Sequence, residues 1–399
     1  MNGQAQMLRV VSDLVEAQLA ESRRTGADTL HRGDWTGQTR IRDGEELVAE
    51  GALGADSFEM LELGARVNQF FHLHEWGTEE NLLRFRTLEG WADVVGQTIR
   101  DDWRCLTFQT SGSSGIPKRV THDRERLEWE ARSWMRLFEG VRRCVSLVPA
   151  HHMYGYQWTV TLPELAGWPV VDGRFWSIPQ LVGEMRPGDL VVGFPLRWEL
   201  IGRYGERVPD GVTGVSSAGA LLNSLWGQLR EMGWGRMLEI YGSTETGGIG
   251  WRESESAGYR LAPGWSRASG EGGSGDRLVW RDKGTVELMD RLDWRQPGEF
   301  RLAGRNDGAV KVGGTLVHFG QVESILREHE AVADCRVKAG GADEARVRAF
   351  VVVRTGEQAL TAQALTRWLR GRLPSVAIPR QIVFGTALPV DGNGKEANW

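Results

Sequence analysis

Residues 108–118 read FQTSGSSGIPK, a segment with two glycines, four Ser or Thr hydroxyls and a terminal lysine. Hydroxyls and the unhindered backbone N–H groups next to glycine can surround phosphate oxygens, and Lys118 adds a positive charge. A Walker-type loop has its lysine directly after a glycine, whereas Lys118 follows Pro117. The segment therefore predicts a polyphosphate-binding loop of another class, with a Ser/Gly-rich surface loop as the alternative. Its predicted phosphate-binding residues are Thr110, Ser111, Gly112, Ser113, Ser114 and Gly115.

Further motifs follow this loop along the chain. They read VPAHHMYG at 148–155, YGSTE at 241–245, VELMD at 286–290 with GEFRLAGRNDGAVKVGG at 298–314, and LPVDGNGKE at 388–396. In this order, the loop and its companions resemble the motifs of the adenylate-forming superfamily, which includes acyl-CoA synthetases, luciferase and the adenylation domains of peptide synthetases. One short motif carries a high false-positive risk, and an ordered series carries much less.

The resemblance implies roles for individual residues in the chemistry of ATP. Lys118 corresponds to the lysine that faces pyrophosphate, Thr244 to the residue that contacts the α-phosphate, and Glu245 to the acidic residue that supports Mg²⁺. Lys395 corresponds to the catalytic lysine of the C-terminal domain. Asp307 corresponds to the hinge about which that small domain rotates between the two half-reactions.

The rest of the implied site binds the nucleoside and the acid. Asp290 and Arg305 correspond to the residues that contact the ribose, although the preceding Thr-Gly of the family is Leu288-Met289 here. The other residues implied to bind the nucleotide are Gly219, Tyr241, Gly242 and Ser243, and those implied to form the gate and pocket for the acid are His152, Tyr154 and Phe194.

The texture of the sequence predicts three regions: a helical region at 1–100, an α/β region at 101–304 and an α+β region at 305–399. The resemblance implies that the second is the adenylating core and the third the mobile C-terminal domain. The expected fold class is α/β, a shortened adenylate-forming ligase core with a small C-terminal domain and a helical, carrier-protein-like N-terminal region. Helices are predicted at 7–21, from Asp56 onward, 87–100, 123–139, 220–232, 320–329 and 361–372, and AVKVGGTLV at 309–317 is predicted to be one strand.

Composition excludes several classes of function. The net charge is −5 and no apolar run approaches the ~20 residues that span a bilayer, so neither a nucleic acid nor a membrane is expected as a partner. The N-terminus does not read as a signal peptide, and a cytoplasmic location is expected. Three dispersed cysteines, Cys105, Cys144 and Cys335, predict core residues rather than disulfides.

The segment LGADSFEMLELGARVNQFF at 53–71 resembles the signature of acyl carrier proteins, in which the serine after Asp carries phosphopantetheine. Ser57 is at that position, and the helices predicted at 7–21 and 87–100 correspond to the flanking helices of a carrier. Two interpretations stay open. The region is a carrier-like acceptor for the acyl group, or it is a remodelled N-terminus in which Asp56 and Ser57 cap a helix packed on the catalytic domain.

The resemblance implies that a carboxylic acid, aromatic or acyl, attacks the α-phosphorus of ATP with Mg²⁺ present, which gives an acyl-adenylate and pyrophosphate. The acyl group then passes to a phosphopantetheine thiol on an acyl carrier protein, on Ser57 of the chain itself, or on CoA. Transfer to a carrier protein is the first expectation. A free acyl- or aryl-CoA ligase and a non-catalytic module that binds nucleotide or acyl-adenylate are the alternatives.

Overall fold

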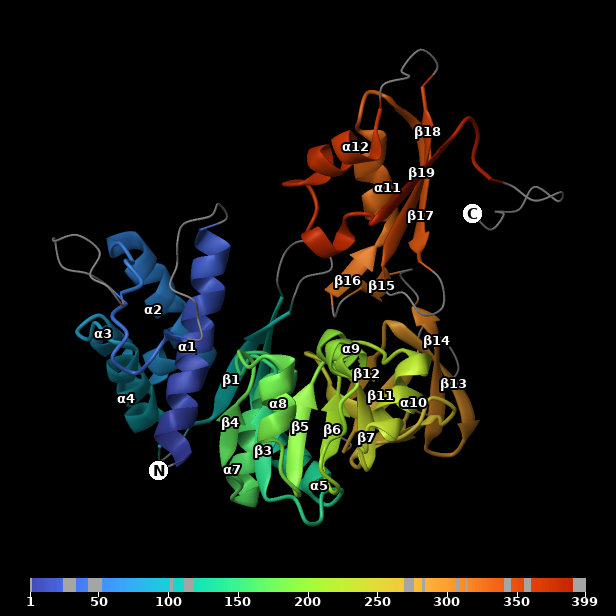
Figure 1. The fold of residues 1–399 in the computed structure, drawn as a ribbon. Coiled ribbons are helices and arrows are strands. Elements are labelled where there is room, and N and C mark those ends of the chain that lie inside the picture. Colours follow the sequence, from blue (N-terminus) through green and yellow to red (C-terminus); the bar gives the residue numbers. More distant parts are fainter. Residues whose placement is uncertain are drawn as a thin grey trace. The chain divides into compact units, whose positions relative to one another are not determined.

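The computed structural model describes residues 2–23, 34–41, 52–100, 103–110, 118–268, 276–281, 284–305, 309–312, 315–340, 346–354 and 360–389 (Figure 1). The chain forms two compact units. Residues 1–110, 118–217 and 229–249 belong to the first unit, and residues 111–117, 218–228 and 250–399 belong to the second.

The first unit begins with a helical region. Asp56 caps α2 by accepting a hydrogen bond from the Glu59 N–H, and Thr87 caps α4 by accepting one from the Gly90 N–H, so the predicted starts of both helices are confirmed. Ser57, the first residue of α2, is exposed. Its elements are α1 (Asn2–Ser22), α2 (Ser57–Phe71), the 3₁₀ turn η2 (Leu73–Trp76), α3 (Glu79–Leu82) and α4 (Leu88–Ile99).

The helical region and the following strands share one hydrophobic core. Val11 and Leu14 of α1, Val67 of α2 and Trp91 of α4 are buried in the same cluster as Phe108 and residues 150–160. The ring of Phe70 lies 5.2 Å from that of Phe108 and 5.7 Å from that of Tyr156. The N-terminal region is therefore packed on the body of the first unit, as the remodelled-N-terminus interpretation expected.

Buried polar contacts attach α1 to the same body. Asp13 is fully buried, forms an ion pair with Arg174 at 2.8 Å and accepts a hydrogen bond from the Ala150 N–H at 2.7 Å. Arg9 donates to Ser146 Oγ at 2.9 Å and to Thr159 Oγ1 at 2.8 Å. A buried charge that loses its partner is costly, so these contacts fix α1 in one position.

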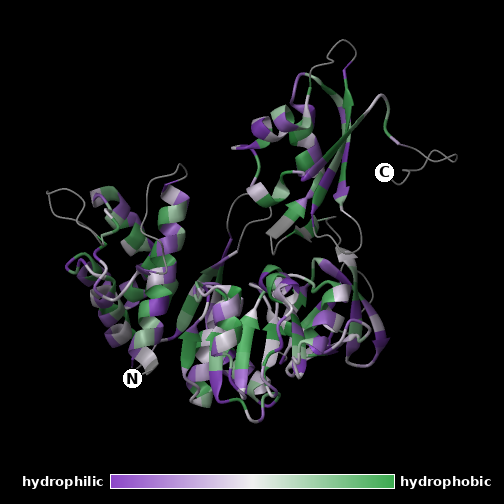
Figure 2. Ribbon diagram, viewed as in Figure 1, coloured by the Kyte–Doolittle hydropathy of each residue, from purple (hydrophilic) through white to green (hydrophobic). Residues whose placement is uncertain are grey.

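The body of the first unit is a parallel sheet in the order β4–β3–β5–β6–β7, with β8 next to β7 and a separate β1–β2 hairpin. β5 is buried along its whole length, as expected for a strand covered on both faces. Figure 2 shows mainly hydrophobic residues along the strands of the parallel sheet, whereas the helices carry both hydrophobic and hydrophilic residues. The elements are β1 (Cys105–Gln109), β2 (Arg119–Asp123), α5 (Arg124–Met135), β3 (Arg143–Ser146), α6 (Met153–Tyr156), the π-helical turn η3 (Gln157–Thr161), α7 (Leu162–Ala166), β4 (Val170–Asp172), α8 (Ile178–Glu184), β5 (Asp189–Gly193), α9 (Pro195–Tyr204), β6 (Thr213–Ser216) and β7 (Arg236–Ser243). Two further elements, α10 (Asn223–Glu231) and β8 (Gly247–Arg252), contain residues of both units.

The second unit is rich in antiparallel pairs. β13 pairs with β14, β14 with β9, and β10, β11 and β12 form another sheet. AVKVGGTLV was predicted to be one strand, and this was wrong, because β15 and β16 pair with each other in antiparallel fashion on either side of the two glycines. The elements are β9 (Tyr259–Leu261), β10 (Trp265–Arg267), β11 (Arg277–Trp280), β12 (Thr285–Glu287), β13 (Asp290–Gln296), β14 (Glu299–Arg305), β15 (Ala309–Val312) and β16 (Thr315–His318).

The C-terminal part of the second unit has a core of its own. α11 and α12 pack against the sheet β17–β18–β19 (Figure 1), and the buried side chains include Val332, Val351 and Leu365. Among the helices of the described residues, none is long and apolar enough to cross a membrane. The elements are α11 (Phe319–Arg327), β17 (Val332–Ala339), β18 (Val347–Val353), α12 (Ala362–Leu369), the 3₁₀ turn η4 (Ser375–Ala377) and β19 (Gln381–Gly385).

Candidate active site

The base of the predicted phosphate loop is a closed hairpin in the first unit. The Thr110 N–H donates to the Lys118 carbonyl at 2.8 Å, and the Lys118 N–H donates to Thr110 Oγ1 at 3.0 Å. These bonds extend the β1–β2 ladder by one pair beyond Gln109 and Arg119. Thr110 and the exposed Lys118 therefore lie side by side. The predicted loop residues Ser111, Gly112, Ser113, Ser114 and Gly115 lie outside the described residues.

Other predicted site residues follow the carboxyl ends of neighbouring parallel strands. Residues 149–155 follow β3, Phe194 follows β5, and residues 241–245 form the end of β7 and the start of the next turn. In open α/β sheets, ligands bind at this edge, where the loops that leave the strands converge. The topology thus brings three separate motifs to one edge of the sheet.

Tyr154 connects two of these strand ends. Its hydroxyl lies 3.0 Å from the carbonyl of Gly193 and 3.1 Å from that of Val215, and it donates its proton to this pair of acceptors. Gly193 is the residue before Phe194, which is half-buried at the start of α9. The Tyr154 side chain is therefore held by two backbone carbonyls, and its role in the acid pocket stays a prediction.

The two histidines before Tyr154 differ in exposure. His152, the predicted gate, is exposed, whereas His151 is buried and its Nδ1 has no hydrogen-bond partner. Burial lowers the pKa of His151 well below the usual value, so its ring is neutral at pH 7. Residue 155 of this loop has to be a glycine, because a Cβ at that position would collide with the Pro149 carbonyl.

The motif at 241–245 forms a tight turn between β7 and β8. The Ser243 N–H donates to Thr246 Oγ1 at 3.0 Å, and the Thr246 N–H donates back to Ser243 Oγ at 3.3 Å. Gly242 is required here because a Cβ would collide with the Gly247 carbonyl. Glu245 is exposed at the tip of the turn, and Tyr241 and Thr244 are half-buried.

His122 of β2 forms a hydrogen bond to the backbone of this turn. Its Nε2 lies 2.6 Å from the Thr244 carbonyl, which can only accept, so Nε2–H is the donor. Burial lowers the pKa of His122 to about 4, which keeps the ring neutral. Because Lys118 stands four residues before His122, the phosphate-loop hairpin and the motif turn are joined through one strand.

Two side chains of α5 hold the other end of the turn. Arg126 donates to the Thr246 carbonyl at 2.6 Å, and Glu130 accepts a hydrogen bond from the Gly248 N–H at 2.9 Å. Burial raises the pKa of Glu130. Sequence reasoning missed His122, Arg126 and Glu130, and the spacing of four between the last two was the one available signal, because it puts both on one helix face.

The predicted ribose-binding residues belong to the second unit. Asp290, the first residue of β13, is the register partner of Arg305, the last residue of β14. At the positions of the family's Thr-Gly, Leu288 is buried and Met289 is exposed.

Three more predicted residues are in the second unit's sequence. Gly219 is half-buried and follows Ala218, which has a positive φ of 69°. Asp307 and Lys395 lie outside the described residues. Their assigned roles stay predictions.

A small pocket in the first unit lies beside β1. Its lining includes donors from α2 and β1 together with the buried His151, so the N-terminal helices help to form a polar pocket next to the strand that leads to the phosphate loop. The lining residues are Leu14, Arg66, Gln69, Phe70, Thr107, Gln109 and His151.

A family model and curated relatives both connect this chain with AMP-binding enzymes. Residues 321–395 match the family described as AMP-binding enzyme C-terminal domain. The chain is 34% identical to a 4-coumarate–CoA ligase from Halorhodospira halophila over 98% of both chains. It is 34% identical to the ligase of the same name from Rhodobacter capsulatus, over 95% of this chain and 97% of that one.

The fold is also shared with solved structures. An o-succinylbenzoate CoA synthetase from Bacillus subtilis superposes with a TM-score of 0.59 at 15% identity, over 98% of this chain and 91% of that one. An amide bond synthetase from Marinactinospora thermotolerans gives a TM-score of 0.59 at 16% identity, over 99% and 98%. The likeness to the curated relatives includes the first hundred residues, because it extends over nearly the whole chain.

Proposed function

The chain belongs to the AMP-binding, or adenylate-forming, enzyme family, and from that premise we propose that it joins 4-coumarate, or an aromatic acid of similar shape, to coenzyme A. It is an AMP-forming acid–thiol ligase: ATP activates a carboxylate as an acyl-adenylate, which a thiol then attacks. The observation that carries the choice of acid and thiol is the full-length likeness to two enzymes named 4-coumarate–CoA ligase. The alternative of a non-catalytic binding module is not retained, because these relatives are ligases.

We assign the first half-reaction to residues of both units. The acid oxygen attacks the α-phosphorus in line, and Lys118 neutralises the departing pyrophosphate. Thr244 contacts the α-phosphate from its anchored turn, and Lys395 bridges the acid and the α-phosphate. Glu245 is exposed at the tip of that turn and offers carboxylate oxygens, which are the ligands that Mg²⁺ prefers. Mg²⁺ would neutralise charge that develops on the phosphates.

We assign the nucleoside to the glycine-rich segments and to the β13–β14 ladder. Asp290 and Arg305 bind the ribose hydroxyls, and their register pairing supports a joint role. Tyr241, Gly242, Ser243 and Gly219 border the base and phosphates. Asp307 is the pivot that removes Lys395 after adenylation and admits the thiol.

We assign the acid to the sheet edge near Tyr154. The Tyr154 hydroxyl is occupied by backbone carbonyls, which leaves its flat apolar ring for contact with a ligand, and the half-buried Phe194 supplies a second aromatic side chain. A planar aromatic acid fits such walls better than a flexible chain. His152, which is exposed, would act as the gate.

An acyl carrier protein is the alternative acceptor, either as a separate protein or as phosphopantetheine on Ser57. Exposure of Ser57 at the start of α2 favours access by a modifying enzyme. The buried anchoring of α1 and α2 disfavours the alternative, because an acceptor fixed to the ligase body cannot travel between sites as a carrier does. We therefore place CoA first.

The test is a reaction of the full chain with ATP, Mg²⁺, CoA and a panel of aromatic and aliphatic acids, followed by chromatography of AMP and of CoA thioesters. We expect 4-coumarate or a related aromatic acid to give the highest kcat/KM. Lys118→Ala should retain the fold and lose on the order of 100-fold in rate, the typical loss for one charge-stabilising group. Efficient thioester formation with aliphatic acids alone would refute the proposed substrate class.

The acceptor needs a separate test. The chain is co-expressed with a phosphopantetheinyl transferase and its intact mass is measured, with a known carrier protein as the positive control. We expect no added mass. A gain of one phosphopantetheine that disappears in Ser57→Ala would overturn the choice of CoA in favour of the carrier interpretation.

A further inference from the structure

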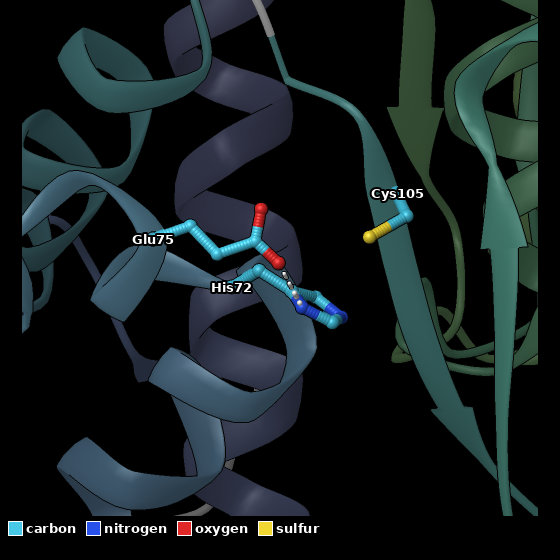
Figure 3. A group of neighbouring side chains, drawn as sticks. All are labelled: His72, Glu75 and Cys105. Carbon is cyan, nitrogen blue, oxygen red and sulfur yellow. Dashed lines mark hydrogen bonds and ion pairs between the residues drawn. The ribbon is translucent and has the colours of Figure 1, made fainter.

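Three side chains that bind metals in other proteins converge where α2 ends beside β1. His72 is the residue that ends α2, Glu75 belongs to η2, and Cys105 is the first residue of β1. One potential ligand atom from each lies within 4.8 Å of the others (Figure 3). In the part of the chain that the structure describes, no other group of three His, Cys, Asp or Glu residues meets this criterion.

The backbone and a hydrogen bond orient His72 toward this cluster. Its φ of 57° is in the left-handed region, which is uncommon for a residue other than glycine, and it ends α2 at this position. The Nε2 atom lies 2.8 Å from Thr107 Oγ1, and that hydroxyl lies 2.7 Å from Thr121 Oγ1. A ligand histidine is commonly fixed in this way, by a hydrogen bond from the nitrogen that does not bind the metal.

The remaining nitrogen faces a carboxylate. Nδ1 of His72 lies 3.0 Å from Glu75 Oε1. The proton of a neutral ring can be on either nitrogen. With the proton on Nδ1, Nδ1–H donates to Glu75 and Nε2 accepts from the Thr107 hydroxyl. With the proton on Nε2, the lone pair of Nδ1 faces the carboxylate, and a positive charge between the two relieves their repulsion. A proton supplies that charge in an ion pair. A cation supplies it as well, and can bind the Cys105 sulfur in addition.

We propose that His72 Nδ1, a carboxylate oxygen of Glu75 and the thiolate of Cys105 bind Zn²⁺. Sulfur, imidazole and carboxylate ligands together are typical of zinc, and three protein ligands leave a fourth tetrahedral position for water. The thiol proton and any proton on Nδ1 pass to solvent as the metal binds, with no change in oxidation state. The site is distinct from the Mg²⁺ ligand Glu245.

The cluster is accessible to a metal ion in solution, because 19% of the His72 side chain and 38% of the Glu75 side chain are exposed. The other two cysteines, Cys144 and Cys335, are buried elsewhere. A metal here would cross-link the end of α2 to β1, and β1 leads to Thr110 at the base of the phosphate loop. Zinc should therefore stabilise the first unit at the position where the helical region meets the hairpin.

The test uses tag-free full-length protein, stripped of metal and titrated with Co²⁺ as a spectroscopic probe for zinc. We expect one equivalent of Co²⁺ to give a thiolate-to-cobalt charge-transfer band, and one equivalent of Zn²⁺ to displace it. Cys105→Ser should abolish the band. Glu75→Gln should weaken Co²⁺ affinity by tenfold or more, whereas Glu80→Gln, a nearby exposed carboxylate outside the cluster, should leave it unchanged.

Absence of a charge-transfer band in the wild type, or a band that persists in Cys105→Ser, would overturn the proposal. Thermal unfolding gives a second readout. One equivalent of Zn²⁺ should raise the Tm of the wild type and of Glu80→Gln, and should not raise that of Glu75→Gln, a variant at an exposed position that is expected to fold. Equal shifts in both variants would contradict the site. None of these outcomes depends on the acid or thiol that the ligase uses.

Discussion

Helices α1, α2 and α4 bury apolar side chains in the same core as β1, Met153 and Tyr156, whereas α11, β17, β18 and α12 at the other end of the chain bury theirs among themselves. Both segments consist of amphipathic elements and differ in texture from the sequence between them. The contrast is that one end completes the catalytic body and the other folds around its own sheet. It teaches that a change of sequence texture does not reveal whether a segment is separately packed.

The polar contacts reinforce the contrast. Asp13 and Arg9 reach from α1 to residues 146–174, far away in sequence. In the C-terminal core, Glu323 accepts a hydrogen bond from the Val337 N–H and pairs with Arg327, both within the same small domain. Long-range polar contacts thus hold the N-terminal region, and local ones support the C-terminal domain.

The largest effect is expected for Asp13→Ala. It leaves Arg174 with one less carboxylate and the Ala150 N–H without its acceptor, and breaking a buried ion pair typically costs about 3–5 kcal/mol. Urea unfolding should measure this loss of stability. Amide hydrogen exchange should be faster than in the wild type in residues 2–100 and 118–217, and unchanged in residues 315–389. Asp210→Ala, at an exposed ion pair, is the control and should change little. A loss below about 1 kcal/mol would mean that α1 is not anchored as described.

The matching change at the other end is Leu365→Ala. Leu365 is fully buried in the C-terminal core, and such truncations cost about 3 kcal/mol within a range of 2–5. Exchange should rise in β17, β18 and α12 while the helical region keeps its protection. Simultaneous loss of protection in α1 would contradict the separation of the two cores.

Acid should weaken the first unit through His122. The pKa of His122 is 6.5 when the side chain is solvated, as in the unfolded chain, and about 4 in the folded protein. As the pH falls, the unfolded chain therefore binds the proton at a higher pH than the folded protein does. The contribution to stability is complete above pH 6.5 and is lost as the pH falls toward 4, with about 2 kcal/mol lost by pH 5. Unfolding midpoints of the wild type and of His122→Gln, which keeps an N–H donor, should diverge in slope over this range. Parallel pH profiles would show that His122 does not titrate as assigned.

The smallest effects are expected for two N-caps, one in the N-terminal helical region and one in the C-terminal domain. Asp56→Ala removes the capping box of α2, and Thr361→Ala removes the side chain that caps α12. Each should cost about 1 kcal/mol. Hydrogen exchange should localise the first loss to the helical region and the second to the C-terminal domain. Asp56→Asn and Thr361→Ser keep an acceptor and should recover most of the loss; failure to do so would argue against capping as the cause.

Local signals predicted the helices well. Asp56 was predicted to cap a helix because a short polar side chain precedes an apolar period, and it does so. The helix predicted from Thr87 also forms, with Thr87 as its cap. The pair of glycines at 313–314 carried a turn signal that the strand prediction for 309–317 disregarded, which is why the β15–β16 pairing was missed.

Burial of charge was not predictable. Arg9 and Asp13 are four residues apart on α1, the spacing of an ordinary solvated pair, yet both are buried because residues 146–174 cover them. The motifs assigned roles to residues of the turn at 241–245, and these roles stay predictions. They gave no sign of His122 or Arg126, since a side chain that supports a backbone carbonyl from another strand or helix follows no local pattern.

The π-helical turn η3 has a consequence for how this enzyme family can vary. A π turn holds one residue more than an α turn, and here the Leu162 N–H reaches back five residues to the Gln157 carbonyl. Removal of one residue from this turn would restore α-helical phase and rotate Tyr154 by about 100° relative to α7. A change of one residue in chain length, with no substitution in the proposed pocket, would thus change the orientation of Tyr154, its proposed aromatic wall, relative to α7. Insertions and deletions at 157–161 would then be the place to look for altered preference among acids.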